Sequence, residues 1–299
     1  MDIKKLRYFL AVVEAGSITA ASRRIPIAQP ALTRQIRLLE ETIGARLFER
    51  DRKGVSLTKA GRYLHDHSRR LLAELDGVAK RTQAISDGYS DNLSIGITTI
   101  HSCIPGISTL ISEFRRRNTA VRLLLETMLS GPQTKAIREG SLDAGILFTE
   151  KEEESGLVYT PLASYRMAVI ARRQRSLNEV VPVSLSDFAA APFIRFSRDS
   201  TPGSYDRVDN CFQQAGIVPN TIQECHDDIT IRSLVAAGMG YAIMPGIMAK
   251  GEQDLVAYEL DDLDIYSQLV LAFRKGTRLS AVKEFSRMAV DVIGGYRSV

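Results

Sequence analysis

The chain has 299 residues and is 44% hydrophobic, enough for two or more domains with their own cores, and no apolar run approaches the ~18 residues of a membrane span. The N-terminus lacks the small-residue cleavage site of a secretory signal, so we expect a cytoplasmic protein without membrane contact. Residues 1–88 carry 17 Lys and Arg against 10 Asp and Glu, whereas the remaining 211 residues carry 22 against 25, so the first third is expected to meet a polyanion.

Two short helices are expected at the start of the chain. Apolar residues recur at helical spacing at Ile3, Leu6, Leu10 and Val13. Gly16 is expected to end this first helix, and Ser17 is placed to cap a second one with the sequence ITAASRR. Pro26 cannot continue a helix, so the second helix should stop before it.

A third helix is expected over residues 29–43, with Pro30 in its first turn and Gly44 at its end. Its core side is formed by Leu32, Ile36, Leu39 and Ile43. Its opposite side carries groups suited to base edges or phosphates, namely Gln29, Thr33, Arg34 and Arg37. A polar face alone is usually just solvated, but a tight turn between two short helices, the second with such a face, predicts a helix-turn-helix.

A small hairpin is expected after the third helix. The runs ARLFER and DRKGVSL are short and extended, and Leu47 and Phe48 should face inward. The turn between them is crowded with cations, namely Arg50, Arg52 and Lys53. A hairpin with a cationic tip beside a helix-turn-helix is typical of a wing that touches phosphate or a minor groove.

These segments resemble a known family. The runs LRYFLAVVEAGSITAAS, AQPALTRQIRLLEETIGARLFER and VSLTKAG, within residues 6–61, are similar in order and spacing to the N-terminal domain of LysR-type transcriptional regulators. The resemblance implies a winged helix-turn-helix over residues 1–57 that binds double-stranded promoter DNA, with residues 29–43 as the recognition helix. The implied DNA contacts are Gln29, Pro30, Thr33, Arg34, Arg37, Arg50, Arg52 and Lys53. Ala28 stands where the family usually has Ser, so a capping hydroxyl that contributes about 1 kcal/mol is absent.

A long amphipathic helix is expected over residues 58–88, starting at Thr58 and followed by a turn-rich boundary from Asp87 to Asn92. Its apolar seam follows a heptad pattern through Leu64, Ser68, Leu71, Leu75, Val78, Thr82 and Ile85. One interpretation is a helix packed on its own domain. We favour self-association, because the small winged domain offers little surface to cover the seam and because LysR-type regulators pair through such a linker. The implied dimer contacts are Leu64, Leu71, Leu75, Val78 and Ile85.

From Leu93 onward, short β-type runs alternate with helical segments, which predicts an α/β fold with mainly parallel sheets. Residues 91–299 could form one domain or two lobes. The effector domains of LysR-type regulators resemble periplasmic binding proteins. That resemblance implies a lobe I of residues 91–162 and 266–299, and a lobe II of residues 163–265, hinged around a cleft.

Hydroxyl and charged side chains follow several of the predicted strands, where ligands bind in open α/β sheets and where helix N-termini offer free N–H groups. The expected effector site comprises Thr98, Thr99, His101, Ser102, Ser130, Arg195, Ser197, Thr201, Asp228 and Thr230. Taken singly, each hydroxyl is more simply interpreted as an ordinary helix cap and His101 as a structural or exposed histidine, while Arg195 is equally consistent with a surface strand residue. Their convergence suits a small carboxylate.

The sequence therefore predicts a LysR-type, sequence-specific transcription regulator, dimeric or tetrameric, whose activity is controlled by a small organic acid bound in the cleft. The family includes activators and repressors, and the resemblance implies RNA polymerase as a further partner. The LRYF opening is most similar to members that control catabolism of aromatic and related organic acids. A solute-binding transport protein would share the second half but would need a signal peptide.

An enzyme is not expected. No GxSxG, HExxH or P-loop motif is present, and the third glycine of a GxGxxG motif is missing after Gly238 and Gly240, so neither catalytic residues, metal nor cofactor are predicted. Cys103, Cys211 and Cys225 are odd in number and lack CxxC spacing. Two alternatives remain open: a thiol redox regulator of the same family that uses Cys211 and Cys225, and a DNA-binding protein without a small effector.

Overall fold

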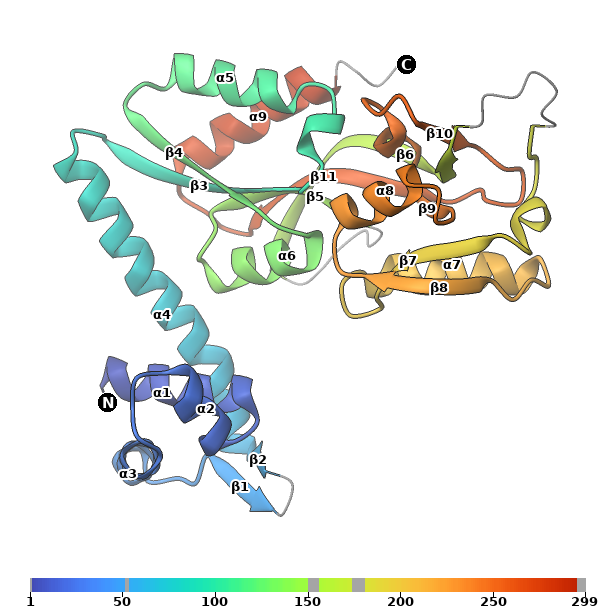
Figure 1. Cartoon of the computed structure of the whole chain (residues 1–299). Helices are drawn as coiled ribbons and strands as arrows, with labels where there is room; N and C mark the ends of the chain where they lie inside the picture. The colour runs from blue at the N-terminus through green and yellow to red at the C-terminus, as the bar shows by residue number, and fades with distance from the viewer. Residues whose placement is uncertain (1, 52–53, 150–155, 174–180, 295–299) are drawn as a thin grey trace. The chain divides into compact units, whose positions relative to one another are not determined.

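The computed structural model describes residues 2–51, 54–149, 156–173 and 181–294 (Figure 1). The chain divides into two compact units, residues 1–80 with 139–141, and residues 81–138 with 142–299, and each is described by itself. Among the described residues, no helix is both long and apolar enough to cross a membrane.

The first unit contains three short helices and a hairpin, and most of a long fourth helix. Their bounds are α1 Ile3–Ala15, α2 Ile18–Arg24, α3 Gln29–Ile43, β1 Phe48–Asp51, β2 Gly54–Leu57 and α4 Lys59–Ser86. The predicted helix ends are confirmed: Gly16 and Gly44 end α1 and α3 in the left-handed conformation, and the Ser17 hydroxyl accepts the Ala20 N–H at the start of α2.

The core of the first unit lies between α1, α3 and the hairpin. The buried face of α3 is formed by Leu32, Ile36 and Leu39 as predicted, whereas Ile43 at its last turn is exposed. The predicted face of α1 is wrong in part: Leu6, Phe9 and Val12 are buried, and Ile3 is exposed. The ring of Phe9 packs against Phe48, with centroids 5.2 Å apart, and this contact turns α1 toward the hairpin.

Helix α4 begins where the sequence predicts. The Thr58 hydroxyl accepts the Gly61 N–H at 2.9 Å and donates to the Arg46 carbonyl at 2.8 Å, so one side chain caps the helix and holds the chain before the hairpin. Gly61 lies so close to the hairpin that an added Cβ would stand 2.1 Å from the Leu47 carbonyl oxygen. Only glycine permits this approach.

The second unit alternates strands and helices. The bounds of its first half are β3 Asp91–Ile97, η1 His101–Cys103, α5 Ile107–Arg117, β4 Val121–Thr127, α6 Ser130–Glu139, β5 Ala144–Thr149 and β6 Leu157–Arg172. Those of its second half are η2 Leu185–Phe188, β7 Pro192–Phe196, α7 Pro202–Gln214, β8 Asn220–Cys225, α8 Asp228–Ala236, β9 Ala242–Pro245, η3 Gly246–Ala249, β10 Leu255–Tyr258, β11 Tyr266–Arg274 and α9 Ser280–Gly294. The predicted α/β class is confirmed.

The main sheet has the order β10-β6-β11-β5-β3-β4, with β9 also paired to β6, and β7 pairs with β8 separately. Strand β3 runs parallel to β4 and β5, and β7 runs parallel to β8. The expectation of mainly parallel sheets is wrong, because β11 returns between β5 and β6 and runs against both, and β9 and β10 run against β6. Apolar runs in the sequence do not record strand direction.

The central strands alternate between two cores, as a period of two residues requires. On one face, Leu269 and Leu271 of β11 join α5 and α9, whose Phe114 and Phe285 rings lie 5.1 Å apart. Val270 and Ala272 point to the other face, toward α6. Figure 1 shows α5 and α9 side by side and α6 apart from them.

Strand β6 serves both halves of the second unit. Its residues from Leu157 to Arg166 pair with β11, and those from Met167 to Arg172 pair with β9 and β10. A further core, with Phe193, Phe212 and Tyr241 among its members, lies in the second half. One continuous strand therefore connects two cores.

The end of α4 belongs to the second unit. Arg81 donates to the buried Asp143 carboxylate at 3.1 Å, and the same carboxylate accepts the Ser94 N–H at 2.8 Å. Burial of Asp143 raises its pKa, against the lowering effect of the Ser94 and Arg81 contacts. The predicted boundary over Asp87 to Asn92 is too long, because Asp91 and Asn92 already belong to β3.

We predict that Gly61→Ala destabilises the first unit by about 2–4 kcal/mol, because the new methyl group meets a backbone oxygen that cannot move independently. Gly77→Ala in the same helix is the matched control: no atom lies within 4 Å of its added Cβ. That change should stabilise the helix by roughly 0.5–1 kcal/mol. Urea unfolding monitored by circular dichroism measures both, and equal stabilities for the two variants would contradict the described packing of α4 on the hairpin.

Candidate functional site

The outward face of α3 carries the predicted DNA-contacting groups. Gln29, Pro30, Arg34 and Arg37 are exposed and Thr33 is half-buried, while the back of the helix lies in the core. Among the described residues, neither Arg34 nor Arg37 has a buried acidic partner. Arg37 pairs with Glu41 at 2.9 Å, and both side chains are mostly exposed. Such a surface pair contributes little and is readily exchanged for a phosphate.

The start of α3 has no side-chain cap. Ala28 occupies the N-cap position and makes no side-chain hydrogen bond, as the sequence predicts, and Pro30 follows in the first turn. The Thr33 hydroxyl donates to the Gln29 carbonyl at 3.0 Å. The first N–H groups of α3 therefore face outward without a side-chain acceptor, and this is the arrangement that binds anions.

The predicted wing is present as the antiparallel pair β1 and β2, with Asp51 opposite Gly54. Arg50 belongs to β1 by its backbone, but its side chain, and both Arg52 and Lys53, lie outside the described residues. The sequence did not reveal how the hairpin is held. The Val55 N–H donates to the Gly16 carbonyl at 3.1 Å, which ties β2 to the turn between α1 and α2.

The heptad seam of α4 is largely open to solvent within one chain. Leu71, Leu75, Val78 and Ile85 are between 38% and 62% exposed. Leu64 behaves differently, because it packs against the core of the first unit. Ser68, another seam residue, is also buried, and Leu72 belongs to the core of the first unit. The packed-helix interpretation therefore fits α4 as far as Leu72.

A cavity of about 380 Å³ lies within the second unit. Four of the residues predicted for the effector site line it, namely Thr98, Ser130, Thr201 and Asp228. Further hydroxyl groups come from Thr134, Thr149, Ser200, Ser204 and Ser267, and apolar contact surface from Leu129, Phe148, Phe196, Pro245 and Met248. The mixture suits a small ligand with an apolar body and a few polar groups.

Three helices begin at this cavity. Ser130 and Gly131 belong to the first turn of α6, Gly203 and Ser204 to that of α7, and Asp228 to that of α8. Neither α6 nor α7 has an acidic residue in its first turn, so their N–H groups and dipoles remain available to an anion. The start of α8 is already neutralised, because the Asp227 carboxylate accepts the Thr230 N–H at 2.7 Å.

The two charged side chains in the cavity wall are Arg207 and Asp228. Asp228 is only 4% exposed, and its Oδ2 accepts a hydrogen bond from the Thr99 hydroxyl. Burial raises the pKa of Asp228, and the Thr99 hydrogen bond acts in the opposite direction. Thr99 thus supports a residue of the cavity although it does not line the cavity itself.

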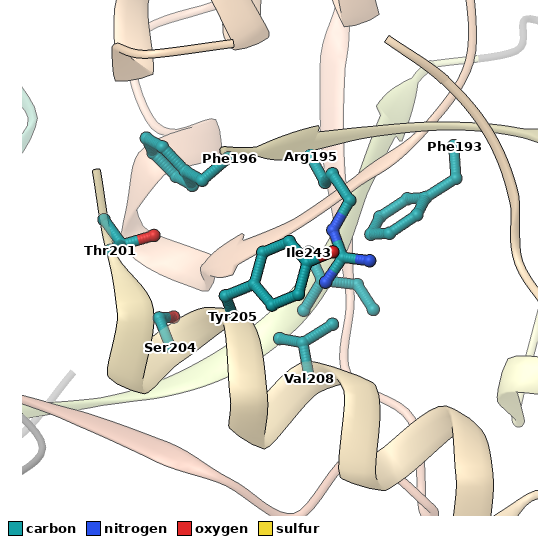
Figure 2. A pocket seen from close by; sticks show the side chains of 8 residues that line it. All are labelled: Phe193, Arg195, Phe196, Thr201, Ser204, Tyr205, Val208 and Ile243. Carbon is teal, nitrogen blue, oxygen red and sulfur yellow. The ribbon is translucent and has the colours of Figure 1, made fainter. Parts of the chain in front are cut away.

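Arg195 does not face the cavity. It is buried, and its guanidinium lies 3.5 Å from the centre of the Tyr205 ring (Figure 2). The guanidinium also donates to the Asp209 carboxylate at 2.7 Å. A chamber of only about 20 Å³ lies beside it and shares Phe196, Thr201 and Ser204 with the larger cavity. Arg195 therefore has a structural role: its ion pair with Asp209 joins β7 to α7.

The remaining predicted effector residues also lie off the cavity wall. Ser197 is buried, and its Oγ lies 2.8 Å from Nδ1 of His226. The Thr230 hydroxyl donates to the carboxylate of Asp227. His101 contacts the Thr98 carbonyl at 3.1 Å, and Ser102 is exposed. Hydroxyl groups that follow a strand thus divide into those that line the cavity and those that form hydrogen bonds elsewhere, and the sequence does not separate the two.

Arg207 was missed by sequence reasoning. It stands in the second turn of α7, three residues after Ser204, so it shares a face of the helix with the cavity-lining first turn. That spacing was the available signal. Within the described residues, the Arg207 guanidinium forms no hydrogen bond and no ion pair.

Two family models match the chain. The model described as "LysR substrate binding domain" matches residues 87–293, and that described as "Bacterial regulatory helix-turn-helix protein, lysR family" matches residues 3–62. The chain belongs to the LysR family of transcriptional regulators. As a LysR-family protein it is a DNA-binding transcription regulator with an effector-binding domain, and not an enzyme.

Two relatives of this LysR-family regulator show the range of similarity. The uncharacterized HTH-type transcriptional regulator YnfL of Escherichia coli K12 is 34% identical over 249 residues, 82% of each chain. ClcR of Pseudomonas putida is 32% identical over 252 residues, 83% of this chain and 84% of that one. The family models and these relatives confirm the predicted resemblance to LysR-type regulators.

Solved structures share the fold. Crystal structures of the LysR-family regulator CbnR, alone and full-length with its target DNA, give TM-scores of 0.66 and 0.64 at 24% and 23% identity. Each covers 98% of this chain and 99% of the other. The similarity spans the whole regulator, from the helix-turn-helix to α9.

The cysteines do not form a prepared redox pair. Cys211 and Cys225 are buried, and burial raises the pKa of both thiols, so the reactive thiolate is disfavoured. Within the described part of the chain, no group of three or more His, Cys, Asp and Glu side chains is placed to hold a metal ion. The effector-controlled interpretation is thereby favoured over the thiol switch.

Asp228→Asn should raise the melting temperature of the ligand-free regulator by about 2–4 °C near pH 7. Because the folded-state pKa of Asp228 lies above its ordinary value of 3.8, its contribution to stability is present below that value and is lost as pH rises through the folded pKa. The difference between variant and wild type should therefore shrink toward pH 4.

Asp187→Asn provides a control of opposite sign for the same measurement. Hydrogen bonds from the Val183 and Ser184 N–H groups lower the pKa of Asp187, so its contribution is present above the ordinary value and is lost as pH falls through the folded pKa. Loss of its charge should lower the melting temperature near pH 7. Differential scanning calorimetry across this pH range checks both, and a less stable Asp228→Asn variant at neutral pH would contradict the described burial.

Proposed function

We propose that the regulator binds promoter DNA through the exposed face of α3 and the β1–β2 wing, as paired subunits, and that a small organic acid in the cavity of the second unit controls it. The observation that carries this function is the combination in one chain of a basic, solvent-facing helix-turn-helix and a separate cavity at helix N-termini. The crystal structure of full-length CbnR with its target DNA supports the first half by analogy. Binding to chromosomal DNA would place the protein in the cytoplasm.

The predicted contacts on α3 fit base and phosphate recognition. Arginine can reach two acceptors of a guanine, and Gln29 can pair with an adenine edge. Arg34 and Arg37 lie three residues apart, so they lie on one side of the helix and can enter the same groove. A winged helix-turn-helix of residues 1–57 followed by a linker at 58–88 is consistent with this use.

Pairing of subunits is supported by the open seam of α4. A helix that leaves several large apolar side chains exposed is more stable when a second copy covers them. Two paired subunits would present two recognition helices and would require two DNA half-sites. Assembly of two such pairs into a tetramer would allow an effector to change DNA bending and the access of RNA polymerase.

The cavity supports effector control. It has the volume and the mixed lining of a small-molecule site, and the free first turns of α6 and α7 favour a carboxylate. The apolar side chains in the cavity wall, next to these free helix starts, support an anionic, partly apolar effector. We propose that two lobes move relative to each other around this cavity when the effector binds. Lobe I comprises residues 91–162 and 266–299, and lobe II comprises residues 163–265.

Arg34→Ala should abolish sequence-selective protection of operator DNA, with a loss of about 1–3 kcal/mol in discrimination, because an exposed cation suited to a base edge is removed from α3. Arg115→Ala on α5 removes the same charge from the second unit and should leave protection unchanged. Footprinting on an operator selected from random DNA by the wild-type protein, together with sedimentation to verify assembly, gives the result. Full protection by Arg34→Ala would exclude α3 as the recognition helix.

Leu75→Glu should dissociate the paired subunits and reduce DNA affinity by at least about tenfold, because a charge replaces an apolar group within the proposed seam. Val218→Glu is the control, since Val218 is an exposed apolar residue far along the chain in the second unit, 90% exposed. Analytical ultracentrifugation over a concentration series measures assembly. If Leu75→Glu assembles as the wild type does, α4 is not the pairing surface.

A further inference from the structure

We propose that the effector carries two recognition groups: an acid bound by Arg207 and the first turns of α6 and α7, and a hydrogen-bond donor, a hydroxyl or ammonium group, bound by Asp228. This inference rests on the proposed function and names the chemical class of its ligand. Asp228 then determines specificity, because it separates such bifunctional acids from simple ones.

The acid-binding end is defined by two independent features. The first turns of α6 and α7 carry no acidic side chain and supply Ser130, Gly131, Gly203 and Ser204 to the cavity wall. Arg207 stands one turn further along α7 in the same wall and has no ion pair within the described chain. A half-buried cation without a carboxylate partner, beside two free helix starts, favours an anion from outside.

The donor-binding end is defined by Asp228. Its Oδ2 is occupied by the Thr99 hydroxyl, whereas Oδ1 receives no hydrogen bond from any described residue. The side chain is 4% exposed and contributes to the cavity wall. The positive charge of Arg232, one turn further along α8, also acts on this carboxylate. Because Asp228 lies in the cavity wall, a hydrogen-bond donor of a ligand can reach Oδ1 from the cavity and stabilise the charge.

The start of α8 does not serve as another anion site. Asp227 caps the helix through its carboxylate, and Asp228 adds a second acidic group in the first turn. Two carboxylates at one helix start repel a ligand carboxylate. The cavity therefore offers a positively charged end at Arg207 and a negatively charged end at Asp228. A ligand with only an acid group can bind the first end but not the second.

The walls between the two ends are apolar. Leu129, Phe148, Phe196 and Met248 contact the same space, so the body of the ligand should be a hydrocarbon skeleton. A cavity of about 380 Å³ accommodates a six-membered ring with two substituents. Hydroxylated and aminated carbocyclic acids meet all three requirements.

The test measures binding of cyclohexanecarboxylate and of its 3- and 4-hydroxy and 3- and 4-amino derivatives, in both cis and trans forms, to the full-length protein by isothermal titration and thermal shift. We expect at least one hydroxylated or aminated acid to bind the wild type at least about tenfold more tightly than the parent acid. Asp228→Asn should not weaken the parent acid and should reduce that preference, more for the ammonium than for the hydroxyl. Arg207→Gln should weaken every acid at least about tenfold, and Arg198→Gln, a neighbouring exposed arginine, none.

Several outcomes overturn the proposal, and they separate it from the proposed function. Equal binding of the parent acid and all its derivatives, or an unchanged preference in Asp228→Asn, would mean that the cavity binds organic acids but that Asp228 does not select a donor. Unchanged acid binding in Arg207→Gln would remove the acid-binding end. If no member of the series binds the wild type, both the donor proposal and organic-acid control fail, while DNA binding through α3 is untouched.

Discussion

The position of α6 depends on the contact of one buried side-chain amide, that of Gln133, with two glycines of the main sheet. Gln133 is completely buried on α6, and an added Cβ would stand 2.7 Å from its Oε1 at Gly96 and 2.5 Å at Gly145. Gly96 and Gly145 lie on the adjacent parallel strands β3 and β5 and face each other in register. The Gln133 amide donates to the Met128 carbonyl at 2.9 Å, so it ties α6 to the chain just before it. Close packing on the sheet thus sets where the first turn of α6 lies, and with it one end of the ligand cavity.

Strand β6 connects the two halves of the second unit, and both halves contribute residues to this cavity. Thr98 and Ser130 come from elements that pair with or follow the β3–β4–β5 group, whereas Arg207 and Asp228 come from elements beyond the middle of β6. The Thr99–Asp228 hydrogen bond joins the same two halves directly. A ligand that touches both halves changes the free energy of their relative placement, and only a difference in affinity between two placements can act on a distant helix.

The sequence predicted the first unit in more detail than the second. Helix α3 has the predicted bounds because Pro30 and Gly44 mark its ends and three apolar residues fix its face. The same reasoning failed to predict strand direction in the main sheet. Strand β11 comes from near the end of the chain, and its local sequence does not indicate that it runs antiparallel to β5 and β6. Thr98 and Ser130 were predicted for the cavity by their place after strands, while Ser197 and Thr230 share that pattern and serve as local hydrogen-bond partners instead. Arg207 could not be chosen among many exposed arginines without knowing which helix starts converge.

The uncapped start of α3 links folding to DNA binding. With Ala28 at the N-cap and no N–H on Pro30, the turn that should enter the groove is held by fewer hydrogen bonds than the starts of α1 and α2, where Asp2 and Ser17 accept backbone amides. A DNA phosphate can supply the missing acceptor from outside the protein. If α3 is the recognition helix that we propose, the backbone amides of this turn should exchange with solvent rapidly in the free protein and slowly on the operator, because the nucleic acid completes the hydrogen bonding of the helix.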